Sequence, residues 1–338
     1  MGEYREVKMN QEGIMVSICC QVYNHERYIQ KCLDGFLMQK TNFRFEVLIH
    51  DDASTDKSQE IIREYEEKYP DIIKPIYQHE NQRSKGKRIV LEYQYPRVKG
   101  RYIAMCEGDD FWIDEMKLQK QVDCLEKNKD SYISGHQVRF VNEQGNQLQQ
   151  VWTINERKSG TINSKEFMKL MVSIEGPWFH TSSFLFRSEC LKEWIDNTPE
   201  FILQCMVGDY PILLYGISKG NVEYINEELG CYRLGSISSV MKNEFADKYV
   251  QLKKNEIETY KLFDQYTDHL YENEVVEHNN LMEYKILFSE KNYNSLIKSK
   301  YRKYYSKKQY VFFRIMAIAP IFGWIEKIYL KLNELKNV

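Results

Sequence analysis

The 338-residue sequence lacks the compositional extremes that would place it in a special class of protein. Seven prolines and sixteen glycines are too few for a collagen-like or low-complexity chain. A hydrophobic content of 43% excludes a wholly disordered protein. The 47 basic and 49 acidic residues leave a net charge of −2, so no global field favours a nucleic-acid partner. Any electrostatic function must therefore be local.

Several familiar motifs are also missing. No C-x-x-C pair occurs among the eight cysteines, and several cysteines lie in apolar runs, which favours a reduced, cytoplasmic chain with cysteine in its core. The charged segment Met1–Gly13 has no apolar stretch typical of a secretory signal. Neither G-x-x-x-x-G-K-[ST] nor G-x-G-x-x-G is present, so a P-loop or dinucleotide fingerprint does not hold phosphate here.

Short apolar runs alternate with helical patterns in the N-terminal part. Strands are expected at Met15–Gln21, Phe45–His50, Ile72–Tyr77 and Tyr102–Cys106, and helices at Tyr28–Met38, Asp56–Tyr69 and Lys117–Lys127. Strands that are apolar throughout, with helices between them, predict a parallel sheet covered on both faces. Ligands of such α/β sheets bind at the carboxyl ends of the strands, so the residues that follow each strand are the place to look for a site.

The C-terminal part does not show this alternation of strands and helices. Met241–Ser289 has the pattern of a long polar helix, and Lys298–Lys308 holds six basic residues and no acidic one. The apolar segment Tyr310–Leu332 follows, but its longest uncharged run, Ile315–Ile325, falls well short of the ~20 residues that span a bilayer. These features favour docking of residues 298–332 on an anionic membrane surface. The alternative is a helix packed on the protein core with solvated lysines.

Acidic residues follow two of the predicted strands. Asp51 and Asp52 come after the second strand, and Glu107-Gly108-Asp109-Asp110 after the fourth. Ser54 and Asp56 fit the role of helix caps. Crowded carboxylates repel one another by about 4 kcal/mol at 4 Å and an effective dielectric of 20. A divalent cation would remove that cost, and oxygen ligands favour Mg²⁺ or Mn²⁺ held jointly with phosphate, so a metal–diphosphate ligand is expected.

Three segments together resemble a known family. VSICCQVYNHE at residues 16–26, EVLIHDDASTD at 46–56 and YIAMCEGDDFW at 102–112 are similar, in order and spacing over about the first 130 residues, to the signatures of family 2 glycosyltransferases with the GT-A fold. The resemblance implies an α/β fold with a mostly parallel central sheet and a helical C-terminal region. It also implies an inverting enzyme that transfers a sugar from a nucleotide diphosphate donor, usually a UDP-sugar, to an acceptor hydroxyl.

The resemblance assigns donor-binding roles to individual residues. Gln21 and Tyr23 fall at the nucleobase pocket, where Tyr23 would stack on the base, and Asp52 matches the carboxylate that accepts a bond from the uracil imide. Gln21 departs from the threonine or proline-threonine pattern that is commoner in this family.

Glu107, Asp109 and Asp110 cover the D-x-D element that contacts the ribose and the Mn²⁺ or Mg²⁺ ion. Glu107 replaces the usual aspartate of this element, so the metal is assigned to Asp109 and Asp110.

The second half of the chain supplies the other expected roles. The resemblance places Asp209, within Val207–Pro211, as the base that takes the acceptor proton, although the same pattern would fit a helix N-cap. Trp112, Trp178 and His180 are expected to bind the acceptor, the tryptophans by stacking on apolar sugar faces and His180 by donating to a phosphate or hydroxyl. The alternative for His180 is a structural side chain. Arg233 could reach the diphosphate or form a surface ion pair.

These expectations define a domain plan and a function. Residues 1–240 would form the glycosyltransferase domain, with the donor half at about 14–130 and the acceptor half at about 131–240, and residues 241–338 a helical region with the membrane-docking segment. The resemblance and the basic tail suggest bacterial surface-polysaccharide synthesis on a saccharide or lipid-linked saccharide, at the inner face of the membrane and without nucleic acid. The alternatives are a metal-dependent nucleotidyltransferase and a non-enzymatic, membrane-recruited binding module.

Overall fold

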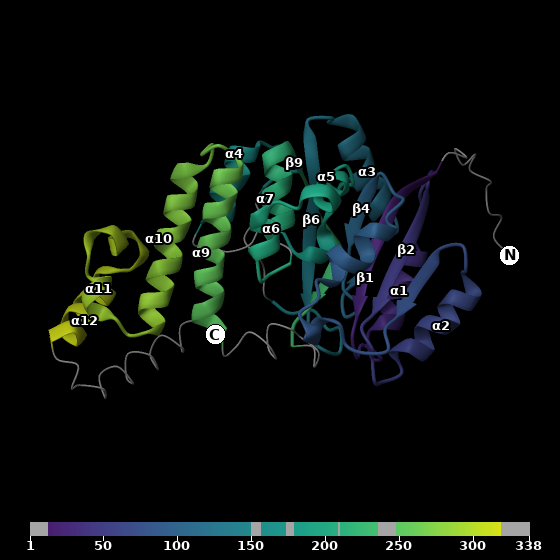
Figure 1. Ribbon diagram of the computed structural model, residues 1–338, viewed down its shortest axis with the longest axis horizontal. Helices are drawn as coiled ribbons and strands as arrows, with labels where there is room; N and C mark the ends of the chain where they lie inside the picture. Colours follow the sequence, from purple (N-terminus) through teal and green to yellow (C-terminus); the bar gives the residue numbers. More distant parts are fainter. Residues whose placement is uncertain (1–12, 150–156, 174–178, 209, 236–247, 319–338) are drawn as a thin grey trace.

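The computed structural model describes residues 13–149, 157–173, 179–208, 210–235 and 248–318. Figure 1 presents an elongated molecule, with the β-sheet and its helices at the N-terminal end and a series of helices leading away from it. The helices α9 and α10 stand side by side, and α11 and α12 lie at the end far from the N-terminal strands (Figure 1).

The N-terminal part alternates strands and helices as the sequence predicts. The elements are β1 (Ile14–Val22), α1 (Ile29–Leu37), β2 (Arg44–Asp51), α2 (Ser58–Lys68), β3 (Ile73–Tyr77), β4 (Tyr102–Met105), β5 (Phe111–Trp112) and α3 (Lys117–Lys127). Short 3₁₀ or π turns, η1 (Arg83–Lys85), η2 (Val90–Gln94) and η3 (Tyr95–Arg97), lie between β3 and β4. The expected elements are confirmed, with α2 beginning two residues later than predicted.

One mixed sheet runs through the molecule, in the order β3-β2-β1-β4-β8-β6-β9-β5, and β7 pairs with β9. The first four strands pair in parallel, as do the long strands β6 (Ser131–Val141) and β9 (Asn221–Arg233). The short strands β5, β7 (Gly160–Ile162) and β8 (Leu185–Arg187) pair antiparallel with their neighbours. These strands have only two or three residues, too few for an alternating pattern to reveal them in the sequence.

Helices and turns complete the second half. They are α4 (Ser164–Met171), η4 (Thr181–Ser183), α5 (Cys190–Asn197), α6 (Glu200–Gln204), α7 (Tyr210–Lys219), α9 (Tyr249–Tyr266), α10 (Glu272–Ser289), α11 (Tyr293–Leu296), η6 (Ser299–Tyr304) and α12 (Lys307–Ile318). The single long helix expected up to Ser289 is wrong, because the described part of it forms the hairpin of α9 and α10. The chain turns at Asp268 and His269, whose φ angles are +49° and +61°.

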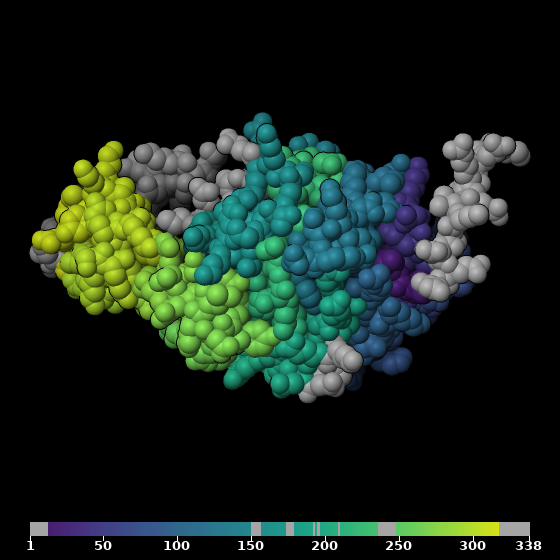
Figure 2. All heavy atoms as spheres, turned by 90° about the horizontal axis from the view of Figure 1, so that it is seen from above, coloured from purple at the N-terminus to yellow at the C-terminus, as the bar shows by residue number. Residues whose placement is uncertain are grey.

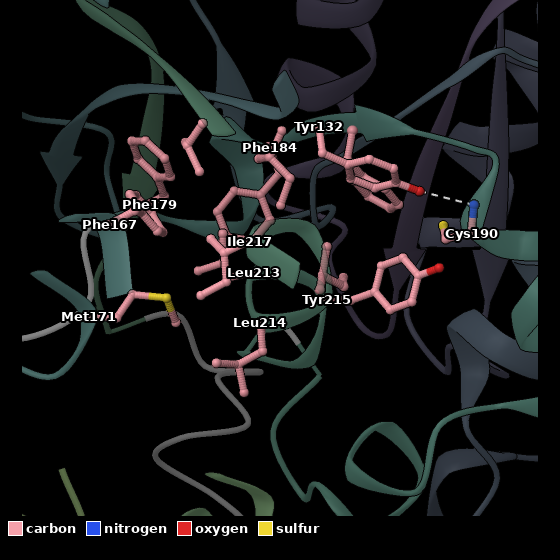
Figure 3. Close-up of a cluster of buried hydrophobic side chains, with 14 of the residues drawn as sticks. Tyr132, Phe167, Met171, Phe179, Phe184, Cys190, Leu213, Leu214, Tyr215 and Ile217 are labelled. Carbon is pink, nitrogen blue, oxygen red and sulfur yellow. Dashed lines mark hydrogen bonds between the residues drawn. The ribbon is translucent and has the colours of Figure 1, made fainter. Parts of the chain in front are cut away.

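Hydrophobic side chains fill both faces of the sheet. In Figure 3, Leu213 and Ile217 of α7 lie beside Phe179 and Phe184, on the face that also receives α4. Tyr132 accepts a hydrogen bond from the backbone N–H of Cys190 at 3.0 Å in the same region (Figure 3). All eight cysteines are free, and seven of them are buried, which confirms the expected use of cysteine as a core residue.

The described part of the basic tail packs partly on the protein. Tyr301 and Phe313 are buried with the aromatic side chains around α11, and this group forms the lobe at the yellow end of Figure 2. Lys300 and Lys303 form ion pairs with Glu283 and Glu277 of α10. Within the described ranges, no helix has the length and apolar character needed to cross a membrane.

Candidate active site

The carboxyl ends of β1, β2 and β4 lie together, as the rule for α/β sheets requires. The backbone N–H of Asp52 donates to the carbonyl of Val22 at 2.9 Å, and that of Gly108 donates to the carbonyl of Gln21 at 2.9 Å. These two bonds bring the segment after β2 and the segment after β4 against the end of β1. The two acidic clusters found in the sequence therefore belong to one site.

Side chains of the second loop hold the first loop in place. Three backbone N–H groups donate to side-chain oxygens at 2.8–2.9 Å: Asn24 to Ser54, His25 to Ser58 and Glu26 to Asp56. The other carboxylate oxygen of Asp56 accepts from the N–H of Ser58, the first residue of α2. The N-cap of α2 is Lys57, so neither Ser54 nor Asp56 occupies the N-cap position expected of it, although Asp56 still bonds the first N–H of the helix and fixes the loop that carries Tyr23.

Asp52 anchors the start of η1. Its side chain is buried, with Oδ1 accepting from the N–H of Gln82 at 2.7 Å and Oδ2 from the N–H of Arg83 at 3.1 Å. Burial opposes its charge, but bonds from His50, Gln82 and Arg83 outweigh this effect and lower the pKa of Asp52. Each oxygen can accept a second bond, so the uracil contact expected of Asp52 stays a prediction.

The two other donor-side residues lie at the same sheet edge. Tyr23 is 41% exposed, which leaves its ring accessible to a stacking partner. Gln21 is partly buried at the end of β1. Both positions are compatible with the expected nucleobase pocket, and the base contacts of Gln21 and Tyr23 stay predictions.

The turn Glu107–Asp110 brings acidic groups together around a buried carboxylate. The N–H of Asp110 donates to the carbonyl of Glu107 at 3.0 Å, and Asp110 is 1% exposed while Glu107 and Asp109 are partly buried. Burial and the charges of Asp109 and Glu107 raise the pKa of Asp110 well above its usual value. Its Oδ2 atom has no hydrogen-bond donor, although Nδ1 of His180 lies 3.5 Å away.

Gly108 is required by the close packing of this turn. A Cβ atom at this position would lie 2.7 Å from Nδ1 of His25 and 3.0 Å from Cγ2 of Val22. His25 is itself buried, and burial lowers its pKa although Asp109 and two other carboxylates act in the opposite direction. The sequence analysis did not include His25 in the site. Its position just after the first strand, at the carboxyl end of the sheet, could have indicated it.

Arg233 locks the acidic turn from the end of β9. Its backbone N–H donates to Oδ1 of Asp110 at 2.9 Å, and its Nε donates to the carbonyl of Asp109 at 2.8 Å. The same guanidinium donates to the carbonyls of Asn142 and Glu143, and it lies 4.5 Å from the ring centre of Tyr28. The surface ion pair considered for Arg233 is wrong, because the residue is 5% exposed and its donors face backbone carbonyls. Contact of Arg233 with a diphosphate stays a prediction.

Trp112 does not face an acceptor. It is 2% exposed, packs edge-on against Phe36 and donates its Nε1–H to the carbonyl of Ser182 at 3.0 Å. The expectation that Trp112 stacks on a sugar is wrong, because β5 turns this ring into the core. An aromatic residue after an acidic motif can point into the core or toward a ligand, and the sequence pattern does not distinguish these two orientations.

His180 lies at the site, beside Asp110. Its ring contacts that of Tyr232 with 3.6 Å between ring centres, and its Nδ1 accepts from the N–H of Ser182 at 3.3 Å. Burial lowers the pKa of His180 to about 3, so the ring is neutral, and its Nδ1 also lies 2.9 Å from Oγ of Ser182. A neutral imidazole can still donate one hydrogen bond to an acceptor or phosphate oxygen.

Two expected site residues, Asp209 and Trp178, lie outside the described residues. The helix α7 begins at Tyr210, next to the expected base. Their roles stay predictions.

The acidic turn fits a cation that is shared with a ligand. Within the described ranges, no group of three or more His, Cys, Asp or Glu side chains could hold a metal ion. A site for Mg²⁺ or Mn²⁺ made of one or two carboxylates and phosphate oxygens does not need such a group. The buried Oδ2 of Asp110, which lacks a hydrogen-bond donor, and the neighbouring Asp109 supply carboxylates of the required kind.

The fold and this site define a class of protein: an α/β fold with a mixed sheet and an acidic turn at the carboxyl ends of its strands. The crystal structure of S. aureus TarS 1-349 in complex with UDP aligns with a TM-score of 0.52 at 16% identity, covering 81% of this chain and 71% of that one. At this identity the likeness concerns the fold.

The sequence places the chain in a family. The sequence pattern of glycosyl transferase family 2 matches residues 17–194, more than half of the chain, and the protein belongs to that family. An uncharacterized protein of Mycobacterium tuberculosis is 42% identical over 130 residues, which are 38% of this chain and 37% of that protein. TuaG of Bacillus subtilis, named for glycosyl transfer in teichuronic acid biosynthesis, is 33% identical over 111 residues, 33% of this chain and 42% of TuaG. These matches thus span less than half of either relative.

Proposed function

We propose that this protein is an inverting glycosyltransferase that moves a sugar from a UDP-sugar to an acceptor hydroxyl. The observation that carries the proposal is the acidic turn Glu107–Asp110, brought by the sheet against the loop of Tyr23 and the segment of Asp52. Family membership supports sugar transfer, and the UDP bound by TarS supports the choice of nucleotide.

The donor is oriented by residues at the ends of β1 and β2. Tyr23 stacks on the uracil, Gln21 lines the base pocket, and Asp52 accepts the bond of the imide N–H. Glu107 and Asp109 face the ribose. When bound, Mn²⁺ or Mg²⁺ stabilises the charge of the departing diphosphate. Asp109 and Asp110 would hold this ion, and Arg233 keeps their turn in place through its bonds to Asp110 and to the carbonyl of Asp109.

The acceptor is activated from the opposite side of the sugar. Asp209 takes the proton of the attacking hydroxyl, while the neutral His180 donates its Nε2–H to an acceptor or phosphate oxygen. An ordinary carboxylate, with a pKa near 4, is a weak base toward an alcohol, so the proton moves late, as the sugar–phosphate bond breaks. No covalent intermediate on the enzyme is required.

The acceptor we propose is a saccharide or lipid-linked saccharide of the bacterial cell surface, contacted by Trp178. The relative TuaG, named for teichuronic acid biosynthesis, supports this substrate class. Such an acceptor would reside at the inner face of the membrane, where the protein would be peripheral.

The membrane contact we propose is α12 with its basic neighbours. Val311 and Ile315 are 56% and 43% exposed and lie four residues apart on this helix, next to the basic start at Lys307 and Lys308. Lys307→Glu/Lys308→Glu should reduce binding to anionic vesicles, because each basic residue near the surface contributes about 1 kcal/mol. Lys127→Glu, an exposed change on α3, is the control. Equal binding by both variants, measured by vesicle sedimentation, would contradict this contact.

The catalytic proposal is tested with a panel of UDP-sugars and Mn²⁺ or Mg²⁺. Asp209→Asn should retain UDP affinity in calorimetry and lose sugar transfer, whereas turnover within about tenfold of wild type would remove Asp209 from the role of base. Pyrophosphate release from a nucleoside triphosphate, with no use of UDP-sugars, would instead favour the nucleotidyltransferase. Nucleotide binding without either reaction would favour a binding module.

A further inference from the structure

A buried lysine lies behind the proposed active site and has no role in the mechanism above. Lys117, the first residue of α3, is 0% exposed, and its Nζ donates to Oε1 of Gln121 at 2.7 Å. The same Nζ lies 3.8 Å from the ring centre of Trp112. Burial lowers the pKa of Lys117 to about 7, with a smaller opposing effect from Cys106. A buried ammonium whose partners are an amide and an aromatic ring is costly to fold, which calls for a functional reason.

Both partners of Lys117 hold the same turn. Trp112 donates its Nε1–H to the carbonyl of Ser182 at 3.0 Å. Gln121 donates its Nε2–H to the carbonyl of Ser183 at 2.8 Å and to that of Ser134 at 3.2 Å. The ammonium can only donate, so it fixes Oε1 of Gln121 toward itself and Nε2 toward these carbonyls. The carbonyls of Ser134 and Ser183 can only accept, so they and Lys117 fix the same orientation of the amide from its two ends.

The held turn is η4, which carries His180 at its start. His180 accepts from the N–H of Ser182 and faces Oδ2 of Asp110 at 3.5 Å. Phe179 and Phe184, on either side of this turn, lie in the hydrophobic cluster (Figure 3). The apolar anchors fix where the turn begins and ends, and the polar bonds of Trp112 and Gln121 fix the orientation of its peptide groups.

We propose that Lys117 is a positioning residue, which acts through Gln121 and Trp112 to hold η4 so that His180 faces the buried carboxylate of Asp110. The part of this inference that concerns turnover rests on the proposed glycosyl transfer; the part that concerns the His180 ring does not. Loss of Lys117 removes the donor to Oε1 of Gln121 and the contact with the Trp112 ring, which loosens the hold of both residues on the turn. The buried charge is then kept for the geometry of the site and not for stability.

The test compares Lys117→Met with Lys127→Met, an exposed change on the same helix. Methionine fits the apolar surroundings and removes the cost of the buried charge, which offsets the hydrogen bond lost by Gln121, so the melting temperature of Lys117→Met should stay close to that of wild type. Its kcat should fall about ten- to hundredfold with the donor KM unchanged, because a misplaced group harms the chemical step. The imidazole signals of His180 in long-range ¹H–¹⁵N spectra should move in Lys117→Met and stay in Lys127→Met.

A second variant covers the case in which Lys117→Met does not fold. Gln121→Glu keeps a partner for the lysine but removes the amide donor to Ser183, and it should show the same shift of the His180 signals. Unchanged His180 signals in a folded variant at either position would overturn the inference. If wild type transfers no sugar from any UDP-sugar, the proposed function fails, while the His180 spectra still decide on Lys117.

Discussion

Replacement of Arg233 by lysine tests whether this side chain locks the acidic turn. The guanidinium donates to the carbonyl of Asp109 with Nε and to those of Asn142 and Glu143 with NH1, at 2.7–3.0 Å. A lysine has one ammonium group at the end of its side chain, so it cannot bond the carbonyl of Asp109 and the carbonyls of Asn142 and Glu143 at the same time. At about 1.5 kcal/mol for each bond from a charged donor, the loss of two bonds costs about 3 kcal/mol.

This cost predicts two measurements on Arg233→Lys. The melting temperature should fall by about 6–12 °C, at roughly 2–4 °C per kcal/mol for a domain of this size. Affinity for UDP with Mn²⁺ should fall at least about tenfold in calorimetry, because Asp109 and Asp110 lose their fixed arrangement. Arg139→Lys is the matched control: Arg139 forms an exposed pair with Glu228 at 2.9 Å, and such pairs contribute about 0–1 kcal/mol. Equal melting temperatures for the two variants would refute the assigned role of Arg233.

Further substitutions test other parts of the structure. Gly108→Ala should weaken binding of UDP with Mn²⁺, because its Cβ would lie 2.7 Å from Nδ1 of His25; wild-type affinity in calorimetry would show that the turn adapts. Trp112→Phe should lower stability by about 1–3 kcal/mol in urea unfolding, because the carbonyl of Ser182 loses its donor, and a change in acceptor KM without loss of stability would contradict its core position. Burial opposes the charge of Glu256, but its contacts with His278 and Lys253 lower its pKa from 4.5 to about 2. The lowered pKa of Glu256 contributes about 3 kcal/mol to the free energy of unfolding above pH 4.5, and this contribution is lost as the pH falls to about 2. Glu256→Gln should remove that pH dependence, and an acid-unfolding curve identical to that of wild type would count against the role of Glu256.

The location of the site could be predicted from the sequence because it follows from strand order. Parallel strands present their carboxyl ends at one edge, so Asp52 and the turn at Glu107–Asp110 had to come near each other once the strands were recognised. The positions of β1 to β4 followed from continuous apolar runs. The family resemblance rested on the same segments, and the family match over residues 17–194 confirms it.

The surroundings of individual site residues could not be predicted in this way. Arg233 contacts carbonyls that lie 90 to 124 residues earlier in the chain, and no local pattern reports such a contact. Trp112 belongs to a two-residue strand whose direction depends on pairing with β9. The burial of Lys117 could not be predicted, because a lysine at the start of a helix is usually exposed. The roles that the resemblance implies for Asp209 and Trp178, which lie outside the described residues, stay predictions.

The most direct test of the central claim is an anomalous-scattering map at the manganese edge from crystals grown with UDP and Mn²⁺. The proposed function requires a manganese peak within coordination distance of a carboxylate of Asp109 or Asp110 and of the UDP phosphates. A peak away from this turn, or UDP bound at another edge of the sheet, would contradict the account.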